Sequence, residues 1–481
     1  MAYGLTMKMK DFNTSSVDRR SWLKSAGLVS AASFLSGTHA AAAGEKKTPT
    51  KKVRGVVFMI SDGMSPGVLS LAEAYSQLTR QRTTQWWQLL NNPTATRGLM
   101  DNASANSLVT DSAAASSAWG GGQRVNNGSI NVKPDGKEIT PIAALLRKKN
   151  AAIGLVTTAT VTHATPAGFA ASISSRSDEQ LIAPQYLDRV DIILGGGSGY
   201  FDAKQRSDQQ DLAGDFKKSG YEVVSDRDQL LAAKSAKILG TFARGHLPFS
   251  IDRNHDAALA ASVPSLAEMT QAALGRFLTG DKPFLLQVEG ARIDHAAHLN
   301  DIGALLGDQI AFDDAVAAVL TMTAKHGDIL VVVTSDHGNS NPGLNGMGDG
   351  YKESNQHFQN IARFKASHER VFGEWNAKPN GDAETIGSLV AEHLGFDLKK
   401  SEAEALIAIL HKENVVEWNH QLEKPEGLLG QFAGNHTGIG WTGTTHTSDP
   451  TLLSAIGPQS SRFSGIIRNS DVFGHLMELL G

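Results

Sequence analysis

Acidic and imidazole side chains recur where short apolar segments of this sequence end. Asp62 follows the segment 55–60, and the pair Asp336 and His337 follows the segment 328–335. Several carboxylates gathered at one place repel one another, and their pKa values rise. Bound divalent cations remove that repulsion and turn it into binding energy. The pattern therefore predicts a metal site that draws on distant parts of the chain.

The spacing and the types of these side chains predict more than one cation. Asp294 and His298 are four residues apart, so on a helix they share a face. With one further histidine they would form a three-ligand zinc site that keeps a position open. Asp336 and His337 can supply two ligands to a second metal. Magnesium prefers oxygen ligands, and the chain offers these after its predicted strands: Asp62, Thr165 and Glu289.

Ser112 is the candidate nucleophile, because it follows Asp111 and precedes a run of small residues, "AAASSA". A serine at this place is commonly a helix N-cap. The N-terminus of a helix also favours an anion, and a metal ion beside a hydroxyl lowers its pKa. The segment 107–119 is expected to form a short strand, a turn and a helix that starts near Ser112. The small side chains would let this helix approach the sheet closely.

Apolar and amphipathic segments alternate along the chain, which predicts a doubly wound, mostly parallel sheet flanked by helices. In such a sheet the functional site lies beyond the carboxyl ends of the strands. The predicted strands are 55–60, 151–158, 190–196, 283–290 and 328–335, the predicted helices are 140–150, 265–278 and 304–326, and 452–458 is expected to return to the sheet. Residues 340–430 break the alternation and are expected to form an insertion or cap.

Bulk composition excludes several classes of protein. With 481 residues, the chain suits one large α/β domain with an insertion, or two domains. Its net charge of -4 gives no basic excess, so nucleic acid is not an expected partner. No segment after the leader approaches the 18 or so apolar residues that a membrane span needs, so none is expected in the mature protein. Cysteine is absent, so disulfides are excluded and any metal must be held by other side chains.

The first 43 residues have the layout of an export signal. Arg19 and Arg20 precede a moderately apolar run that ends in small residues, and this resembles a twin-arginine signal peptide. Residues 44–52 then form a charged linker. The expected location of the mature protein is the periplasm or the medium outside the cell.

The segment "VTDSAAASS" resembles the signature of the alkaline phosphatase family, in which an aspartate and the nucleophilic serine are followed by small residues. The resemblance covers most of residues 53–481 and includes "GVVFMISDGM", "GLVTTATVTHATPAGFAASISSR", "LLQVEGARIDHAAH" and "VVVTSDHGN". It is thinnest over 340–430, where the family carries a crown. The resemblance implies an alkaline-phosphatase-like α/β fold and hydrolysis of small phosphate monoesters, and many of the similar proteins are homodimers.

The resemblance also implies roles for individual residues, with two zinc ions and one magnesium ion as cofactors. Ser112 would become phosphoserine, Arg176 would grip two phosphate oxygens, and Asp111 would steer that arginine. A guanidinium fork suits this task better than an ammonium group does. The implied ligands are Asp294, His298 and His446 for the first zinc, Asp62, Asp336 and His337 with Ser112 for the second, and Asp62, Thr165 and Glu289 for magnesium. His163 and His295 would lie near magnesium and phosphate, outside the ligand shells.

Some alternatives remain open at this stage. His436 competes with His446 for one zinc position, because both lie in the segment 434–450 and Ser448 replaces the glycine usual after the family's ligand. Ser116 and Ser117 also depart from the signature. A phosphodiesterase or sulfatase on the same scaffold is the nearest rival activity, although such enzymes often use threonine or a modified cysteine as nucleophile. A non-catalytic periplasmic phosphate- or metal-binding protein is the rival from another class, and it would need no Asp-Ser pair.

Overall fold

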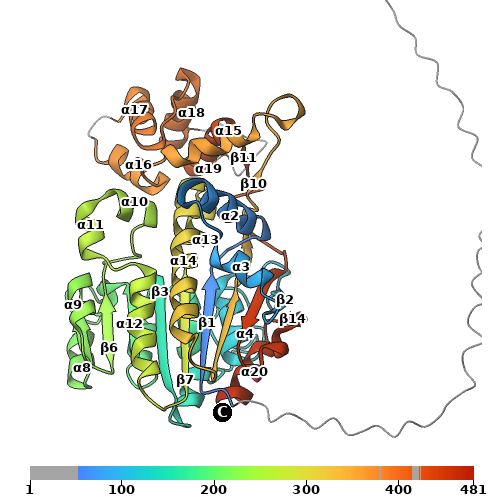
Figure 1. Cartoon of the computed structure of the whole chain (residues 1–481). Coiled ribbons are helices and arrows are strands. Elements are labelled where there is room, and N and C mark those ends of the chain that lie inside the picture. The colour runs from blue at the N-terminus through green and yellow to red at the C-terminus, as the bar shows by residue number, and fades with distance from the viewer. Residues whose placement is uncertain (1–51, 379–380, 414–421, 423) are drawn as a thin grey trace, which may run out of the picture. The chain divides into compact units, whose positions relative to one another are not determined.

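The structure is a computed structural model that describes residues 52–378, 381–413, 422 and 424–481. The predicted signal peptide (1–43) lies outside the described residues, as does the predicted linker (44–52) apart from its last residue. The fold described below is that of residue 52 onward, shown in Figure 1.

A ten-stranded sheet forms the centre of the fold, in the order β14-β2-β13-β8-β1-β7-β3-β4-β6-β5. β1 lies between β7 and β8 and is parallel to both, with Gly55 opposite Phe284 on one side and Ile329 on the other. The strands are β1 (Gly55–Ser61), β2 (Thr96–Asp101), β3 (Ala152–Thr160), β4 (Ile192–Gly196), β5 (Glu222–Val224), β6 (Ile238–Thr241), β7 (Phe284–Gly290), β8 (Ile329–Thr334), β13 (Thr451–Ile456) and β14 (Gly465–Arg468).

The central strands β1, β7 and β8 are buried along their whole length. Parallel strands are covered on both faces, so they read as continuous apolar runs rather than alternating ones. The five segments predicted as parallel strands correspond to β1, β3, β4, β7 and β8. The predicted α/β class, with a mostly parallel sheet flanked by helices, is confirmed.

One edge of the sheet departs from the parallel pattern. β13 runs antiparallel to β8 and to β2, and β14 pairs in parallel with β2. The prediction that 452–458 returns to the sheet is confirmed, with β13 as the returning strand. The sequence does not predict β2, β5, β6 or β14, because each is short or only partly buried and none carries a long apolar run.

Helices cover both faces of the sheet. On one face α14 packs against α2, α3 and α12, and on the other α4 packs against α6 and α20. The two apolar cores follow the pleat of β1, since Val57 and Met59 belong to one core and Phe58 and Ile60 to the other. The helices of these layers are α2 (Pro66–Arg80), α3 (Gln85–Asn91), α4 (Ser112–Gly121), α5 (Ile142–Arg147), α6 (Ala164–Ala170), α7 (Glu179–Ile182), α8 (Leu212–Lys218), α9 (Arg227–Ala232), α10 (Ser250–His255), α11 (Ala257–Ser262), α12 (Leu266–Leu278), α13 (Arg292–His298), α14 (Ile302–Thr323) and α20 (Asp471–Leu480).

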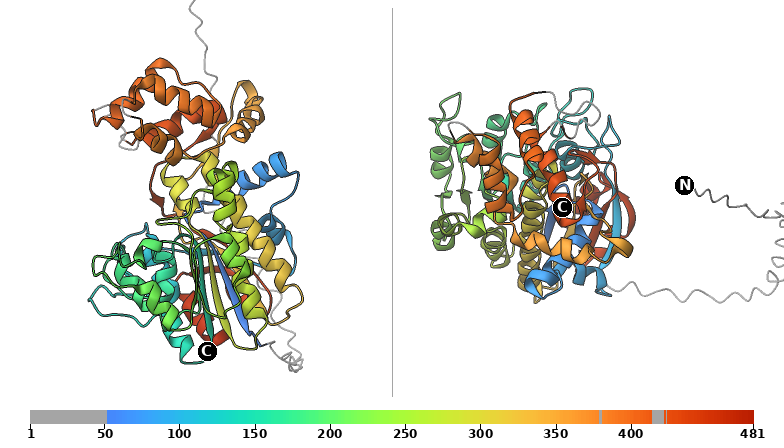
Figure 2. Two further views of the ribbon diagram at one scale, coloured as in Figure 1. Left: turned by 90° about the vertical axis from the view of Figure 1, so that its left-hand side faces the viewer. Right: turned by 90° about the horizontal axis from the view of Figure 1, so that it is seen from above.

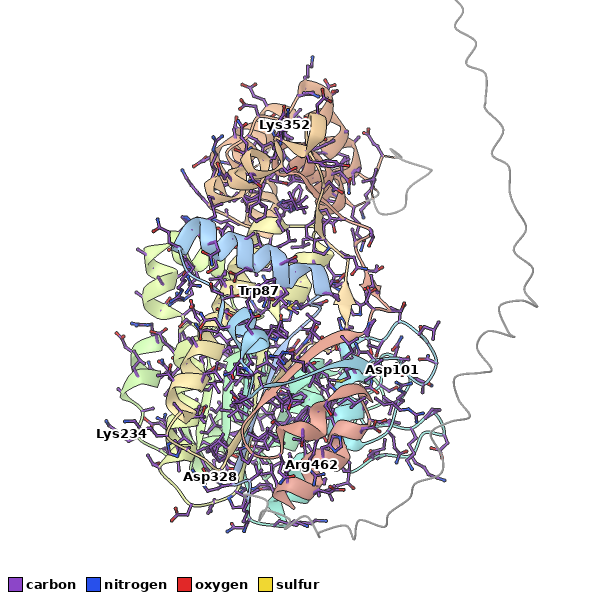
Figure 3. All side chains as sticks on the ribbon, turned by 45° about the vertical axis from the view of Figure 1, so that its right-hand side comes forward. Trp87, Asp101, Lys234, Asp328, Lys352 and Arg462 are labelled. Carbon is purple, nitrogen blue, oxygen red and sulfur yellow. The ribbon has the colours of Figure 1, made fainter. Side chains whose placement is uncertain are left out.

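A group of helices between β8 and β13 adds no strand to the ten-stranded sheet; we call residues 349–437 the crown. Its helices are α15 (Ser354–Gln359), α16 (His368–Asn376), α17 (Ala383–Leu394), α18 (Lys400–Leu410) and α19 (Pro425–Thr437). Figure 2 shows them gathered at one end of the fold. Lys352 lies at that end and Asp328, just ahead of β8, at the opposite end (Figure 3). The crown therefore stands over the carboxyl ends of the strands.

Short two-residue strands connect the crown to the rest of the fold. β9 (Gly338–Asn339) pairs with β12 (His446–Thr447), and β10 (Gly343–Leu344) pairs with β11 (Ile439–Gly440). The β9–β12 pair sets His446 opposite Asn339, beside the residues that follow β8. The chain thus returns from the crown at the carboxyl end of the sheet.

The segment ahead of Ser112 differs from the sequence prediction, which was wrong in placing a short strand there. Residues 102–111 form bends and irregular backbone, and the Leu108 side chain is 80% exposed. This segment has no neighbouring strand that could pair with it, because the sheet edge beyond β2 is taken by β14. The helix nevertheless begins at Ser112, as predicted.

Candidate active site

The predicted site residues follow the carboxyl ends of four neighbouring strands. Asp62 comes directly after β1, Glu289 is the second-last residue of β7, and Asp336 follows β8. Thr165 comes after β3, in the first turn of α6. Since parallel strands end at one rim, these side chains converge although they are up to 274 residues apart in the sequence.

Asp62, Asp336 and His337 form a group that we call the inner cluster. Nε2 of His337 lies 3.1 Å from Oδ2 of Asp336 and 3.6 Å from Oδ1 of Asp62, and all three side chains are 0% exposed. The backbone N–H of Gly63 donates to Oδ1 of Asp336 and holds that carboxylate in place. The three ligand atoms lie close enough together to share one cation.

Asp294, His298 and His446 form a second group, the outer cluster. Nε2 of His298 lies 3.4 Å from one carboxylate oxygen of Asp294, and Nε2 of His446 lies 3.5 Å from the other. The two Nε2 atoms are 3.0 Å apart. Ligand atoms of a tetrahedral zinc ion lie about 3.3 Å from one another, since each is ~2.0–2.1 Å from the metal. The outer cluster therefore has the spacing of a tetrahedral site.

Backbone carbonyls fix the tautomers of the two outer histidines. Nδ1 of His298 lies 2.7 Å from the Thr444 carbonyl oxygen, and Nδ1 of His446 lies 2.8 Å from that of Thr110. A carbonyl can only accept, so each Nδ1 carries the proton and each Nε2 presents a lone pair to the centre of the cluster. This is the usual arrangement of histidines that bind metals.

The structure brings His446, and not His436, to the cluster. The His446 ring stacks on that of His337 at a centroid distance of 3.7 Å, so the outer cluster contacts the inner one. His436 lies in α19 of the crown, where its ring stacks on Phe396 at 4.4 Å. Position in the fold thus decides between the two residues that the sequence left open.

Asp62, Thr165 and Glu289 form a third group, the oxygen cluster, which shares Asp62 with the inner cluster. Thr157 Oγ1 donates to one oxygen of Glu289 at 2.5 Å. His163 also lies near this group, because one of its ring nitrogens is within 4.8 Å of a carboxylate oxygen of Asp62 and of one of Glu289. The sequence placed His163 outside the ligand shells, whereas the geometry puts it within reach of the oxygen cluster.

Buried polar atoms without partners mark the places where cations would fit. Both carboxylate oxygens of Asp62 and one each of Asp336 and Glu289 are buried without a hydrogen bond, as is the Thr165 hydroxyl. Leaving such groups unpaired costs ~1–3 kcal/mol each, more when they are charged. Nearly all of them are acceptors that point into the inner and oxygen clusters. Bound dications would satisfy them, so the donor sets fit metal ions.

The pKa values of these side chains also support the conclusion that the clusters fit metal ions. Without cations, complete burial raises the pKa of Asp62 well above its usual range, and the neighbouring carboxylates raise it further. Burial also raises the pKa of Glu289 to about 7. Asp294 differs: burial opposes its ionisation, but the imidazoles of His298 and His446 hold the pKa of its carboxyl well below the usual range. Asp62 and Glu289 therefore need added positive charge to be ionised together.

Ser112 lies at the first turn of α4, against the inner cluster. Its Oγ is 3.2 Å from Nε2 of His337, and the residue is 1% exposed. Asp111, rather than Ser112, is the N-cap: one of its oxygens accepts from the N–H of Ala114. The hydroxyl of Ser112 is therefore free of the capping role that is its ordinary alternative.

Small residues let α4 lie close to α6, whereas the sequence analysis expected them to let this helix approach the sheet. A Cβ atom on Gly120 would fall 1.9 Å from the Gly168 carbonyl oxygen, and one on Gly168 would fall 2.2 Å from Oγ of Ser116. Ser116 itself donates to the Ala164 carbonyl. This close packing fixes the start of α4, and with it Ser112, against the helix that carries Thr165.

Asp111 also holds the predicted phosphate-binding arginine. Nη1 of Arg176 donates to Oδ2 of Asp111 at 3.1 Å, and the same oxygen accepts from the N–H of Gly128. Nη2 of Arg176 lies 3.0 Å from Nε2 of His163. The Arg176 side chain is 25% exposed. Asp111 and His163 thus hold the guanidinium in place, and part of the Arg176 side chain remains exposed.

Three histidine rings lie side by side next to Arg176. His295 is 5.5 Å from His163 and 4.5 Å from His246, measured between ring centroids. The sequence analysis singles out His163 and His295 but misses His246, which follows β6 and gives no signal of its own. Arg292, which contacts His295, is also missed, although it lies between Glu289 and Asp294.

Asn339 is a further residue that sequence reasoning misses. Its Nδ2 donates to Oδ1 of Asp294 at 2.7 Å, and its backbone pairs with that of His446. It comes two residues after His337. Asn339 thus contacts Asp294 and pairs with His446, both of the outer cluster, and it follows His337 of the inner cluster closely in sequence. Its position directly after "DHG" is the one sequence signal that could have identified it.

None of the helices among the described residues is both long and apolar enough to cross a lipid bilayer.

Comparison with known proteins identifies similar chains along nearly the whole sequence. The family model for alkaline phosphatase matches residues 53–481. Alkaline phosphatase 3 of Bacillus subtilis is 31% identical over 467 residues, covering 93% of this chain and 94% of its own.

Solved structures of alkaline phosphatases are also similar to this chain over most of its length. The crystal structure of Thermus thermophilus alkaline phosphatase is similar with a TM-score of 0.84 and 34% identity, over 89% of this chain and 91% of that one. The cold-active alkaline phosphatase from a psychrophilic Shewanella species has a TM-score of 0.73 and 28% identity, over 89% of this chain and 100% of its own.

Proposed function

This chain belongs to the alkaline phosphatase family and is a metal-dependent phosphatase, and from that premise we propose that it hydrolyses small phosphate monoesters through a phosphoserine formed on Ser112. The observation that carries the proposal is the position of the Ser112 hydroxyl, 3.2 Å from Nε2 of His337 at the start of α4. A protein that only binds phosphate or metal would need no nucleophile there.

In the first step, the Ser112 hydroxyl gives up its proton to solvent, Oγ attacks the phosphorus atom, and the bond from phosphorus to the alcohol oxygen breaks. The alcohol leaves and takes up a proton from water. The N-terminus of α4 favours negative charge at this oxygen. In the second step, water attacks the phosphoserine, the Oγ–P bond breaks, and serine and inorganic phosphate are released.

Arg176 would bind the phosphoryl group through its guanidinium fork. Asp111 holds one end of the fork and His163 the other, so the group is oriented before substrate arrives. Preorganised donors of this kind are worth ~10²–10³-fold in turnover when removed. The contacts favour a terminal dianionic phosphate, which supports a monoesterase over a diesterase.

We assign zinc to the inner and outer clusters and magnesium to the oxygen cluster. Imidazole nitrogen is a favoured zinc ligand, and the inner cluster contains one histidine and the outer cluster two, whereas sets of oxygen atoms suit magnesium. When bound, these dications would neutralise the clustered carboxylates, lower the pKa of the Ser112 hydroxyl and stabilise charge on the phosphoryl group. The ligands are those of the three clusters, with Ser112 joining the inner one.

The test of this function is the Ser112→Ala variant beside Ser116→Ala. Both serines are buried in α4, but Ser116 only donates to a backbone carbonyl. We expect Ser112→Ala to lose nearly all hydrolysis of nitrophenyl phosphate and all acid-trapped phosphoserine, and Ser116→Ala to keep both. Wild-type activity in Ser112→Ala would disprove the nucleophile. Faster hydrolysis of bis-nitrophenyl phosphate than of nitrophenyl phosphate by the wild type would favour a diesterase.

We further infer that the protein is exported, on the strength of the twin-arginine pattern in residues 1–43. The route carries folded proteins, which suits a chain that acquires its metals before export. The experiment compares the full chain with an Arg19→Lys, Arg20→Lys variant in a bacterial host. We expect activity in the periplasm or medium for the former and in the cytoplasm for the latter. Equal distribution of the two would contradict the inference.

A further inference from the structure

Arg292 is a buried guanidinium that joins the crown to the site. It opens α13, the helix that carries Asp294 and His298, and its side chain is 4% exposed. Nη2 donates to Oε2 of Glu369 in the crown at 2.8 Å, and the guanidinium carbon lies 3.6 Å from the centre of the Phe249 ring. Stacking and ion pairing together leave this side chain little freedom.

The remaining contact of Arg292 determines the protonation of a histidine. Nη1 lies 3.0 Å from Nδ1 of His295. Arginine has donors and no acceptor, so Nδ1 of His295 must accept and the ring proton must be on Nε2. The contact with Arg292 thus leaves Nε2–H as the hydrogen-bond donor of the His295 ring.

The same reasoning applies across the site to His163. Nη2 of Arg176 donates to Nε2 of His163, so the proton of that ring is on Nδ1. The rings of His163 and His295 are 5.5 Å apart and nearly perpendicular. Arg176 therefore sets the tautomer of His163, and Arg292, which is paired with the crown, sets that of the neighbouring His295.

The crown end of this connection is itself held in place. Glu369 is in the first turn of α16, beside Ser367 and His368. The Ser367 hydroxyl and N–H donate to Asp252, and the N–H of His368 donates to Asp301, the N-cap of α14. These buried carboxylates attach the start of α16 to the helices under it. Glu369 is 59% exposed, but its backbone is fixed relative to α13 and α14.

We propose that Glu369 and Arg292 are positioning residues that hold His295 in its Nε2–H tautomer, as a hydrogen-bond donor for the phosphate bound at Arg176. The crown would in this way tune the anion affinity of the catalytic site through one ion pair. The proposal rests on the proposed function, because the anion is the substrate or product phosphate.

The central experiment is a double-mutant cycle on Arg292 and His295, read as the inhibition constant of inorganic phosphate and as the KM and kcat for nitrophenyl phosphate. Arg292→Met keeps the stem that packs on Phe249 but removes the donors. We expect it to raise the inhibition constant and KM by about tenfold, the effect of one hydrogen bond to a charged group, with a smaller change in kcat. In a His295→Ala background the same substitution should add less than about twofold. If the fold-changes of the two single substitutions multiply in the double variant, the proposal is overturned.

Glu369 gives a milder variant that leaves the buried arginine in place, in case Arg292→Met does not fold. We expect Glu369→Ala to raise the inhibition constant of phosphate about threefold, and Glu369→Gln, which keeps an acceptor, to restore most of the loss. The control is Arg370→Ala, which breaks the neighbouring ion pair to Glu374 without touching His295. An Arg370→Ala effect equal to that of Glu369→Ala would mean that the crown acts only as a scaffold and would contradict the proposal.

A spectroscopic reading separates this inference from the proposed function. In protein labelled with ¹⁵N-histidine, the imidazole nitrogen shifts distinguish the two tautomers, and the His295 signals are identified by their absence in His295→Ala. We expect one tautomer, protonated at Nε2, in the wild type and a mixture in Arg292→Met. An unchanged tautomer would overturn the inference. Absence of any phosphatase turnover in the wild type would instead defeat the proposed function.

Discussion

The inner and outer clusters use similar ligands but differ in how the fold holds them. The inner ligands follow β1 and β8 and are 0% exposed. The outer ligands come from α13 and from the two-residue strand β12, and His298 and His446 are 35% and 14% exposed. One cluster is thus part of the buried rim of the sheet, and the other is assembled from separate elements at its surface.

This difference indicates distinct tasks. A cation in the inner cluster would compensate carboxylates that have no access to water, so the folded state itself depends on it. A cation in the outer cluster would be reachable from solvent, as a site that receives a leaving alcohol or water must be. Stability and ligand exchange are therefore expected to separate between the two clusters.

Removal of metal should give the largest effect, and it tests whether the inner and outer clusters differ in their access to solvent. We expect a chelator to take zinc from the outer cluster first and from the inner cluster more slowly, because only the outer one is open to solvent. Activity should fall by on the order of 10³-fold or more once the first zinc is lost, given what preorganised charges contribute to turnover. Bound zinc and residual activity measured together over time check this, and loss in a single phase would contradict it.

Substituting one ligand of each cluster should give the next largest effect. We expect His337→Gln to lower both turnover, by ~10²–10³-fold, and the melting temperature. His298→Gln should lower turnover similarly, regain part of it in excess zinc, and change the melting temperature less. His436→Gln serves as the control, because this crown histidine lies apart from the clusters. Equal thermal shifts for His337→Gln and His298→Gln would show that the two clusters support the fold alike.

The metal-free protein should become less stable as pH rises. Burial raises the folded-state pKa of Glu289 from 4.5 to about 7, so the folded state favours the neutral acid. The resulting stability is complete below about 4.5 and is lost as pH rises through about 7, with an amplitude of about 3 kcal/mol. Urea unfolding of chelated protein between pH 4 and 8 measures it. Glu289→Gln should flatten the dependence, and metal-loaded wild type should not show it.

Asn339→Ala should give the smallest of these effects and sharpen the comparison within the outer cluster. Nδ2 of Asn339 holds Oδ1 of Asp294, and loss of such a partner of a metal ligand typically costs ~10–100-fold in metal affinity. We expect competition with a zinc chelator to show this loss for one zinc only. Asn360→Ala, which removes a hydrogen bond to the His436 carbonyl in the crown, is the control. Unchanged affinity in Asn339→Ala would assign Asn339 a merely structural role.

The strand ends could be read from the sequence because buried parallel strands are continuous apolar runs. Asp62, Glu289 and Asp336 end or follow such runs, and the rule that strand ends meet at one rim brings them together without knowledge of packing. The resemblance to a family added Arg176 and His446, which no pattern of spacing identifies.

The remaining features depend on contacts between segments that the sequence does not relate. Arg292 reaches Glu369 across 77 residues, and only the docking of α16 on α14 brings them together. Asn339 reaches Asp294 because β9 pairs with β12. The irregular segment ahead of Ser112 has local strand character but no neighbour to pair with, so local propensity is overruled by topology.

The position of β13 in the sheet has a consequence for synthesis of the chain on the ribosome. β2, which leads toward Ser112, lies between β13 and β14 in the strand order, and both of these come from the last 31 residues. His446, just before them, completes the outer cluster. A nascent chain must therefore emerge from the ribosome through Arg468 before this edge of its sheet can close, and the outer cluster stays incomplete until His446 has emerged.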